Sequence, residues 1–265
     1  MSRLVWDQTG QKYYQHGVDR GVIYPLTSAG TYPLGYAFNG LREVQLNNDG
    51  GDPTKLYANN NVYGMSRGRV DKEGSATFYT YPDVLRECWG WREVAPGMIL
   101  DQQTIKMFGM TYRIMIENDT GDENYELHFL YGVSMTPPDI TAGTDEDDVE
   151  AQELDTDFTT VPVPVTGSRP VAHFLVDSRT IPAAKLAEIE NIIYGTDDTN
   201  ARLPLPDEII TLINTNNDPV TYTVVEPEEN ANPASSGWYE IVDGDYVATT
   251  DTTVVDDKTY YSRNT

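Results

Sequence analysis

The longest regular pattern along the chain is an alternation of apolar and polar side chains between Lys106 and Met135. Residues 123–135 place large apolar side chains at every second position, as a β-strand does when one face lies on a core. Residues 106–117 alternate in a similar way, and the polar segment Asn118–Asp122 separates the two arms. The pattern predicts a long β-hairpin at the centre of a sheet, with these residues on one face of its second arm: Tyr125, Leu127, Phe129, Tyr131 and Val133.

Shorter β-patterns occur on both sides of this hairpin. Residues 35–46 are predicted to form a strand with Asn39-Gly40 as a turn or bulge, and residues 69–81 a second strand. Residues 158–165 and 171–178 alternate as well. Residues 1–33 are rich in Tyr, Gly and Pro with little periodicity, so we expect an extended arm with short strand pieces. The predicted fold class is therefore mainly β.

One segment, residues 182–194, has a helical pattern. Pro182 suits a first turn, and Gly195 suits the position just beyond a helix. A short turn or helix is expected after Pro82, and a last strand or short helix within residues 200–213. The predicted helix presents one apolar stripe, at three- and four-residue spacing: Leu186, Ile189, Ile192 and Ile193.

Residues 47–68 are polar and rich in Asn, Gly and Asp, so we expect a long irregular connection between two core strands. A loop of roughly 20 residues in a compact domain is uncommon and usually functional. Its carboxylates lack the alternating ligand spacing and the closing Glu of a calcium loop, so we predict no metal there.

The formal net charge of −24 is unevenly distributed. Residues 1–120 are nearly balanced, whereas residues 121–160 contain 12 Asp and Glu and no Lys or Arg. Such a surface repels nucleic-acid phosphates and anionic membranes, which excludes recognition of nucleic acid by a basic patch. The single cysteine, Cys88, excludes an internal disulfide and is expected to be a buried small hydrophobe. The first residues lack an apolar signal segment, so we expect folding in the cytoplasm.

Motifs for common chemistry are absent from the sequence. There is no phosphate-binding glycine loop, no zinc-type His and Cys spacing and no Gly-x-Ser-x-Gly turn. The three histidines, His16, His128 and His173, are far apart along the chain. His128 and His173 are expected on sheet faces, and whether they meet in space stays open. We predict no cofactor.

Seven segments occur in an order and at intervals that resemble one family. They are WDQTG (6–10), GVDRGVIYP (17–25), YAFNGL (36–41), PTKLYANN (53–60), ATFYTYPD (76–83), FGMTYR (108–113) and ENDTG (117–121). Over roughly residues 1–215 the chain resembles the major tail protein, or tail tube subunit, of long non-contractile-tailed phages that infect Gram-positive bacteria. Two departures are Phe38, where Trp is expected, and the more aromatic segment 86–91.

This resemblance implies a tail-tube-type β-sandwich or barrel with one flanking α-helix. It implies a non-enzymatic virion protein, in which six copies close into a ring and rings stack into a hollow tail tube assembled in the host cytoplasm. Other tail proteins, such as the tape measure and the tail terminator, would be partners. DNA would pass through the lumen without specific binding, and no membrane would be involved.

Two sets of surface residues are candidates under this interpretation. The acidic set, within the connection 137–157, is either a solvated loop or a negative collar on an assembly surface: Asp145, Glu146, Asp147, Asp148 and Glu150. The assembly-contact set lies in the polar connection 47–68: Asn47, Asp49, Asp52, Tyr57, Asn59, Asn60, Asn61 and Tyr63.

The texture of the chain changes after Asn214, which predicts a tail tube domain over residues 1–217 and a small β-rich appendage over residues 218–265. The appendage is expected to contain strands at 220–225 and 258–263 and a hairpin around Asp243-Gly244. Residues 237–263 resemble a small tag at the ends of assorted phage virion proteins. The alternative function is a glycan- or cell-wall-binding β-sandwich, which the number of Tyr and Trp residues favours.

Overall fold

The computed structural model describes residues 4–68, 70–144, 151–215, 221–225, 232–236, 238–242, 245–250, 255 and 259–264. The chain divides into two compact units, Met1–Ile213 and Asn214–Thr265. The predicted mainly β fold is confirmed, with antiparallel sheets, helices beside them and short strands near the C-terminus.

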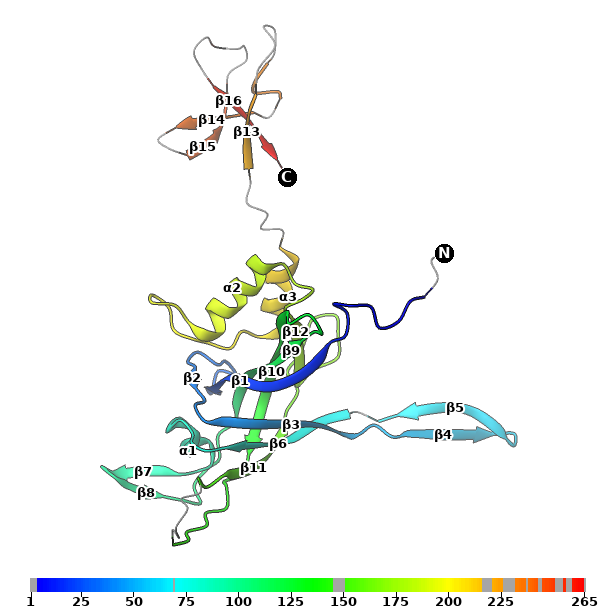
Figure 1. Ribbon diagram of the computed structural model, residues 1–265, viewed down its shortest axis with the longest axis vertical. Coiled ribbons are helices and arrows are strands. Elements are labelled where there is room, and N and C mark those ends of the chain that lie inside the picture. Colours follow the sequence, from blue (N-terminus) through cyan, green and yellow to red (C-terminus); the bar gives the residue numbers. More distant parts are fainter. Residues whose placement is uncertain are drawn as a thin grey trace. The chain divides into compact units, whose positions relative to one another are not determined.

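The first unit is built on one antiparallel sheet, coloured from blue to green in Figure 1. The central hairpin is confirmed: β9 (Phe108–Glu117) pairs with β10 (Glu123–Met135). Along the sheet the order is β2 (Tyr36–Ala37), β1 (Tyr14–Pro25), β9, β10, β11 (Leu154–Thr160), β6 (Val70–Phe78) and β3 (Leu41–Gly50). β12 (His173–Asp177) also pairs with β10.

One edge of β10 serves two different neighbours. Its residues 126–130 pair with β12, and residues 133–135 pair with β11. The change occurs at a bulge between Leu130 and Val133, where Gly132 has a φ of +56°. A Cβ on Gly132 would lie 2.4 Å from the Val161 carbonyl oxygen, so glycine is required both by the backbone conformation and by the close approach.

Alternate residues of the central strands enter two separate cores. Leu127, Phe129 and Tyr131 pack toward the helices, in the helix-side core. Leu130 belongs to the other cluster, the Trp89-side core. The prediction that Val133 shares a face with Tyr131 is wrong, because the bulge turns Val133 into the Trp89-side core. The helix-side core consists of Val22, Tyr24, Tyr32, Leu127, Phe129, Tyr131, Val176, Ile189, Ile193, Leu203 and Ile209.

The predicted helix is confirmed as α2 (Ala183–Tyr194), and its apolar stripe faces the sheet, with Ile189 and Ile193 buried. Gly195 ends it with a φ of +78°. The segment left open between strand and helix forms α3 (Pro206–Asn214), which also contributes to the helix-side core through Ile209.

The Trp89-side core gathers aromatic rings around α1 (Val84–Cys88). Trp89 stacks on Phe78 with ring centroids 6.1 Å apart, and Tyr81 meets Trp89 edge-on. Cys88 is buried, as expected, and burial raises the pKa of its thiol to about 12. At neutral pH this thiol is therefore protonated and a poor nucleophile.

Two regions predicted to be irregular are regular in the structure. β1 occupies twelve residues of the segment 1–33, which was expected to be extended with only short strand pieces. The expected loop 47–68 continues β3, then forms β4 (Pro53–Ala58) and β5 (Asn61–Arg67), which pair with each other. Composition misleads here because Asn, Asp and Gly favour loops, whereas pairing with a neighbouring strand overrides that preference.

Two further departures concern strand boundaries. β11 begins at Leu154, within the expected acidic connection, and β12 begins at His173. The turn at Asn39-Gly40 is confirmed, with a φ of +78° at Gly40. A second small hairpin, β7 (Arg92–Ala95) with β8 (Met98–Leu100), precedes β9.

The second unit contains a small antiparallel sheet of order β13 (Thr221–Val225), β16 (Tyr260–Asn264), β14 (Tyr239–Val242) and β15 (Asp245–Ala248). The two strands expected around Asp243-Gly244 are present and pair directly, whereas these two turn residues lie outside the described part of the chain. Trp238 and Tyr260 pack together with ring centroids 5.9 Å apart.

The apolar stripe of α2 makes a measurable prediction. Ile189→Ala is expected to lower the free energy of unfolding by about 2–5 kcal/mol, because it leaves a cavity around a side chain that is 0% exposed. The same substitution at Ile210 of α3, which is 45% exposed, should cost less than about 1 kcal/mol. Urea denaturation of both variants tests this, and similar losses at both positions would contradict it.

Candidate assembly surfaces

The first unit has a long exposed hairpin formed by β4 and β5, here called the arm (residues 53–67). In the sheet order β4 and β5 form a separate two-stranded sheet, which extends away from the main sheet (Figure 1). Its tip is a two-residue turn, Asn59-Asn60, with φ values of +50° and +63°. Two left-handed residues define a type I′ turn, and Asn tolerates this conformation better than most residues.

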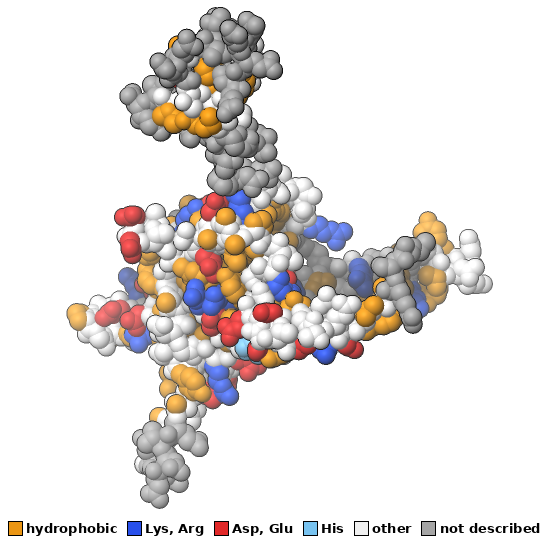
Figure 2. Space-filling model, turned by 45° about the horizontal axis from the view of Figure 1, so that its top comes forward, with side chains coloured by type: hydrophobic (Ala, Val, Ile, Leu, Met, Phe, Trp, Pro, Cys, Tyr) orange, Lys and Arg blue, Asp and Glu red, His pale blue; other side chains and the backbone are white. Residues whose placement is uncertain are grey.

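The arm exposes large apolar side chains to solvent. Tyr57 is 69% exposed and Tyr63 is 80% exposed. Tyr57 pairs across the strands with Val62, and Lys55 pairs with Met65, so these side chains share one face of the hairpin. Figure 2 shows hydrophobic side chains along this projection. The exposed large hydrophobic residues of the arm are Leu56, Tyr57, Val62, Tyr63 and Met65.

Glycines separate the arm from the main sheet. Pairing of β3 with β6 ends at Gly50 opposite Val70, and pairing within the arm begins at Pro53 opposite Arg67. Gly50 and Gly51 both have positive φ, +73° and +77°, and a Cβ on Gly68 would lie 3.8 Å from the Gly51 backbone. The outgoing strand thus passes from the sheet into the arm through Gly50 and Gly51, whose backbone conformation glycine adopts easily.

The predicted assembly-contact residues fall on three parts of this one ribbon. Asn47 and Asp49 lie on β3, opposite Glu73 and Asp71. Asp52 lies in the glycine crossing, and the other members are on the arm: Tyr57, Asn59, Asn60, Asn61 and Tyr63. The structure therefore places the whole set along one extended hairpin. Their contact role stays a prediction.

A second exposed apolar hairpin escaped the sequence analysis. β7 and β8 expose Val94, Met98, Ile99 and Leu100 around a Pro96-Gly97 turn, in which the Gly97 amide donates to Glu93 Oε1 at 2.9 Å. Exposed apolar clusters of this kind mark interaction surfaces. The signal available in the sequence was the Pro-Gly pair between two short apolar runs.

The predicted acidic set, Asp145, Glu146, Asp147, Asp148 and Glu150, lies outside the described residues. Within the described part of the chain, no cluster of three or more His, Cys, Asp or Glu is placed to hold a metal ion. No helix there is long and apolar enough to cross a membrane.

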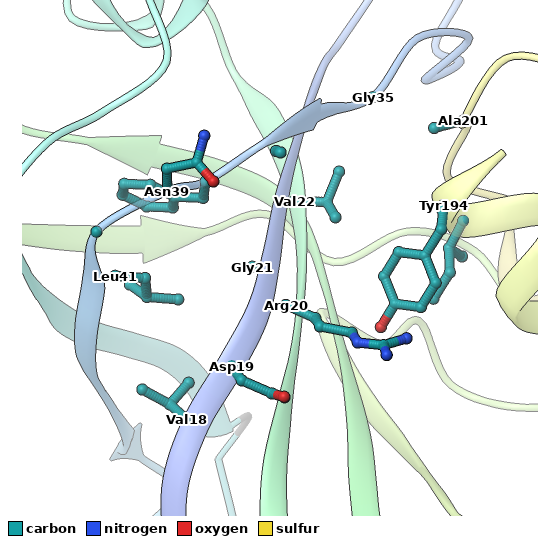
Figure 3. A pocket seen from close by; sticks show the side chains of 14 residues that line it. Val18, Asp19, Arg20, Gly21, Val22, Gly35, Asn39, Leu41, Tyr194 and Ala201 are labelled. Atoms are coloured by element: carbon teal, nitrogen blue, oxygen red, sulfur yellow. The ribbon is translucent and has the colours of Figure 1, made fainter.

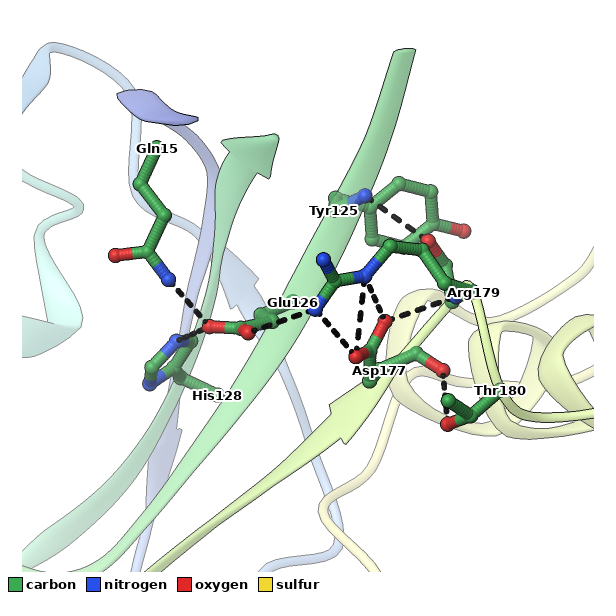
Figure 4. A network of polar contacts seen from close by, with 8 residues as sticks. Gln15, Tyr125, Glu126, His128, Asp177, Arg179 and Thr180 are labelled. Atoms are coloured by element: carbon green, nitrogen blue, oxygen red, sulfur yellow. Dashed lines mark hydrogen bonds and ion pairs between the residues drawn. The ribbon is translucent and has the colours of Figure 1, made fainter. Parts of the chain in front are cut away.

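A polar network crosses the sheet from β1 to β12, and Figure 4 shows its contacts. Glu126 of β10 accepts a hydrogen bond from Gln15 Nε2 at 2.8 Å and lies 3.6 Å from Arg179. Arg179 donates two hydrogen bonds to the Asp177 carboxylate, from Nε at 2.9 Å and from Nη2 at 2.6 Å. The pKa of Asp177 is lowered by this bond, so the carboxylate stays charged.

Beside this network the two distant histidines meet. His128 Nδ1 and His173 Nε2 are 3.0 Å apart, and the His128 ring stacks on Tyr112 at 4.9 Å between centroids. Burial lowers the pKa of both histidines to about 4, although Glu126 lies 3.7 Å from His128 Nε2. At neutral pH the pair is therefore uncharged and serves to join β10 to β12.

No family model matches the chain, and no curated protein matches it. Among solved structures it is similar to the sheath/tube terminator, in the extended state, of an extracellular contractile injection system (PVC). That similarity has 11% sequence identity and a TM-score of 0.30, over 65% of this chain and 99% of that chain.

The histidine pair predicts a pH dependence of stability. In the unfolded chain the pKa of each histidine is about 6.5, whereas in the folded chain the pKa of each is about 4. The unfolded state binds more protons between these values, so the free energy of unfolding should fall as pH falls from about 6.5 to about 4.

Replacing His128 should reduce the slope of the free energy of unfolding against pH. We expect His128→Leu to lose part of the decrease between pH 6.5 and pH 4.5, measured by urea denaturation at several pH values. An unchanged slope in His128→Leu would show that protons are taken up elsewhere.

Proposed function

We propose that this protein is a structural virion protein, the subunit of a phage tail tube, and not an enzyme. The arm carries this proposal: an ordered hairpin whose large apolar side chains face solvent in the single chain. An isolated two-stranded hairpin is at best marginally stable in water. Covering the arm with a neighbouring copy would bury the exposed tyrosines and fix the position of the arm. Tyr57 and Tyr63 both belong to the predicted assembly-contact set.

The edges of the main sheet support self-assembly. β2 covers only two residues of β1, so among the described strands Tyr14–Arg20 pair with β9 alone. At the other end of the sheet order, β3 pairs with β6 on one side. Unpaired strand edges invite pairing with another chain, and closing a ring of copies removes them. We propose rings of six copies, as the sequence resemblance implies.

Stacked rings would form the tube through which DNA is ejected. A formal charge of −24 per copy gives the assembly a strongly negative field, which repels DNA phosphates and lets the genome pass without specific binding. The tape measure and tail terminator would be further partners, and the site of action is the virion tail after assembly in the host cytoplasm. No cofactor is needed for this role.

The glycan-binding alternative is favoured by one observation. The exposed rings of Tyr57 and Tyr63 could stack on sugars as well as on a second copy of the chain. Binding to a cell-wall or glycan array by a protein that stays monomeric would favour this alternative.

Electron microscopy of the purified protein tests the proposal. We expect rings or tubes from the unaltered chain, and none at the same concentration from the double variant Tyr57→Ser, Tyr63→Ser. Because both side chains are exposed in the single chain, the free energy of unfolding should change by less than about 1 kcal/mol. Ile140→Ser, which alters a side chain that is 72% exposed outside the arm, is the matched control and should still assemble. Rings from the double variant would overturn the role of the arm.

The second unit is predicted to be dispensable for the tube. A chain that ends at Thr215 keeps all of the first unit, so it should fold with a cooperative urea transition and assemble. Sedimentation velocity and electron microscopy measure the result. A truncated chain that folds but remains monomeric would place the second unit in the contacts between copies.

A further inference from the structure

A pocket of about 590 Å³ opens where β1, the turn before β3 and the end of α2 meet (Figure 3). The sequence analysis identified none of it as a site. Its wall includes Arg20 of β1, Asn39 of the turn and Tyr194 at the last position of α2. These three residues are far apart in the sequence, and the pocket lies outside the arm.

A β-bulge aims Arg20 into this pocket. Asp19 pairs with Arg113 and Val22 pairs with Thr111, so Arg20 and Gly21 together oppose Tyr112 alone. Arg20 has a φ of +48°, a left-handed conformation that is uncommon for arginine and costs free energy. Bulges of this kind redirect a side chain, and strained residues concentrate at functional sites.

The Arg20 guanidinium has no carboxylate partner among the described residues. Its contact there is with the ring of Tyr194, whose centroid lies 5.6 Å from the guanidinium carbon. The nearby carboxylates are engaged elsewhere. Asp19 accepts two hydrogen bonds from Arg113, at 2.9 and 2.6 Å, and Glu190 accepts one from the Tyr125 hydroxyl at 2.8 Å and lies 3.7 Å from Arg113.

A second donor in the pocket is also unused. The Tyr194 hydroxyl is buried and has no hydrogen-bond partner in the described part of the chain. Figure 3 shows it directed toward the Arg20 guanidinium. Burial, the largest cause, raises the pKa of Tyr194, so the hydroxyl keeps its proton and can donate. A buried donor left unpaired costs free energy.

We propose that this pocket binds a carboxylate, and that its ligand is an Asp or Glu side chain of a second copy of the chain. The planar guanidinium matches a carboxylate with two parallel hydrogen bonds. The chain has 42 Asp and Glu against 18 Lys and Arg, so a neighbouring copy presents mainly carboxylates. This inference rests on the proposed self-assembly and adds a contact that is separate from the arm.

Substitution of Arg20 tests the contact between copies. Arg20→Asn removes the charge with a residue that tolerates positive φ, so the fold should be kept. We expect the protein concentration needed for assembly to rise about tenfold or more, and Arg20→Lys to restore only part of it. Arg169→Gln, which removes one charge from another exposed arginine, should change that concentration less than about twofold. Assembly of Arg20→Asn at the concentration of the unaltered chain would overturn the proposal.

A second measurement tests the pocket without assembly. At concentrations where the protein is monomeric, sodium acetate is titrated against sodium chloride at constant ionic strength, and the arginine Nε–H signals are followed by NMR. A saturable acetate shift that Arg20→Asn abolishes is expected, and its absence would overturn carboxylate binding. If the unaltered chain forms no rings or tubes, the proposed function fails and so does the second copy as ligand, while an acetate shift would still establish the pocket.

Discussion

The first unit depends on the bulge in β10 at Gly132. This one distortion lets a single strand pair with β12 along its first part and with β11 along its last part, so one strand joins two branches of the sheet. It also reverses the alternation, so that Val133 and Met135 enter the Trp89-side core and not the helix-side core that Tyr131 enters. A side chain at Gly132 would meet the Val161 carbonyl oxygen and push the β11 branch away. The helices and the aromatic cluster would then lose the common support that holds them together.

The parts of this fold that sequence patterns predict are those set by local periodicity. The hairpin of β9 and β10 and the helix α2 were predictable because each presents a regular apolar stripe along its own sequence. The reversal at Val133 was not, because a bulge depends on which strands lie on either side. The arm was missed because its Asn and Gly content is typical of loops, while its strands exist through pairing with each other.

The candidate sites show the same division. The sequence indicated the region that contains Tyr57 and Tyr63, since a long polar insertion between core strands is unusual. It could not show the meeting of His128 with His173, or of Arg20 with Tyr194, because the residues of each pair come from separate segments that only the folded sheet brings together. The positive φ of Arg20 could not be predicted from the sequence, because arginine rarely adopts this conformation.

The glycine crossing at the base of the arm has a mechanical consequence. Gly51 and Gly68 lie between two separately paired ribbons, so a change of direction there need not break a hydrogen bond of either ribbon. If each arm is anchored on the next ring of a tube, rotation at Gly51 and Gly68 would allow a tilt between rings while the anchored arm stays in place. Such a tube would curve by many small swivels at its joints, and bending stress would not reach the core of any subunit.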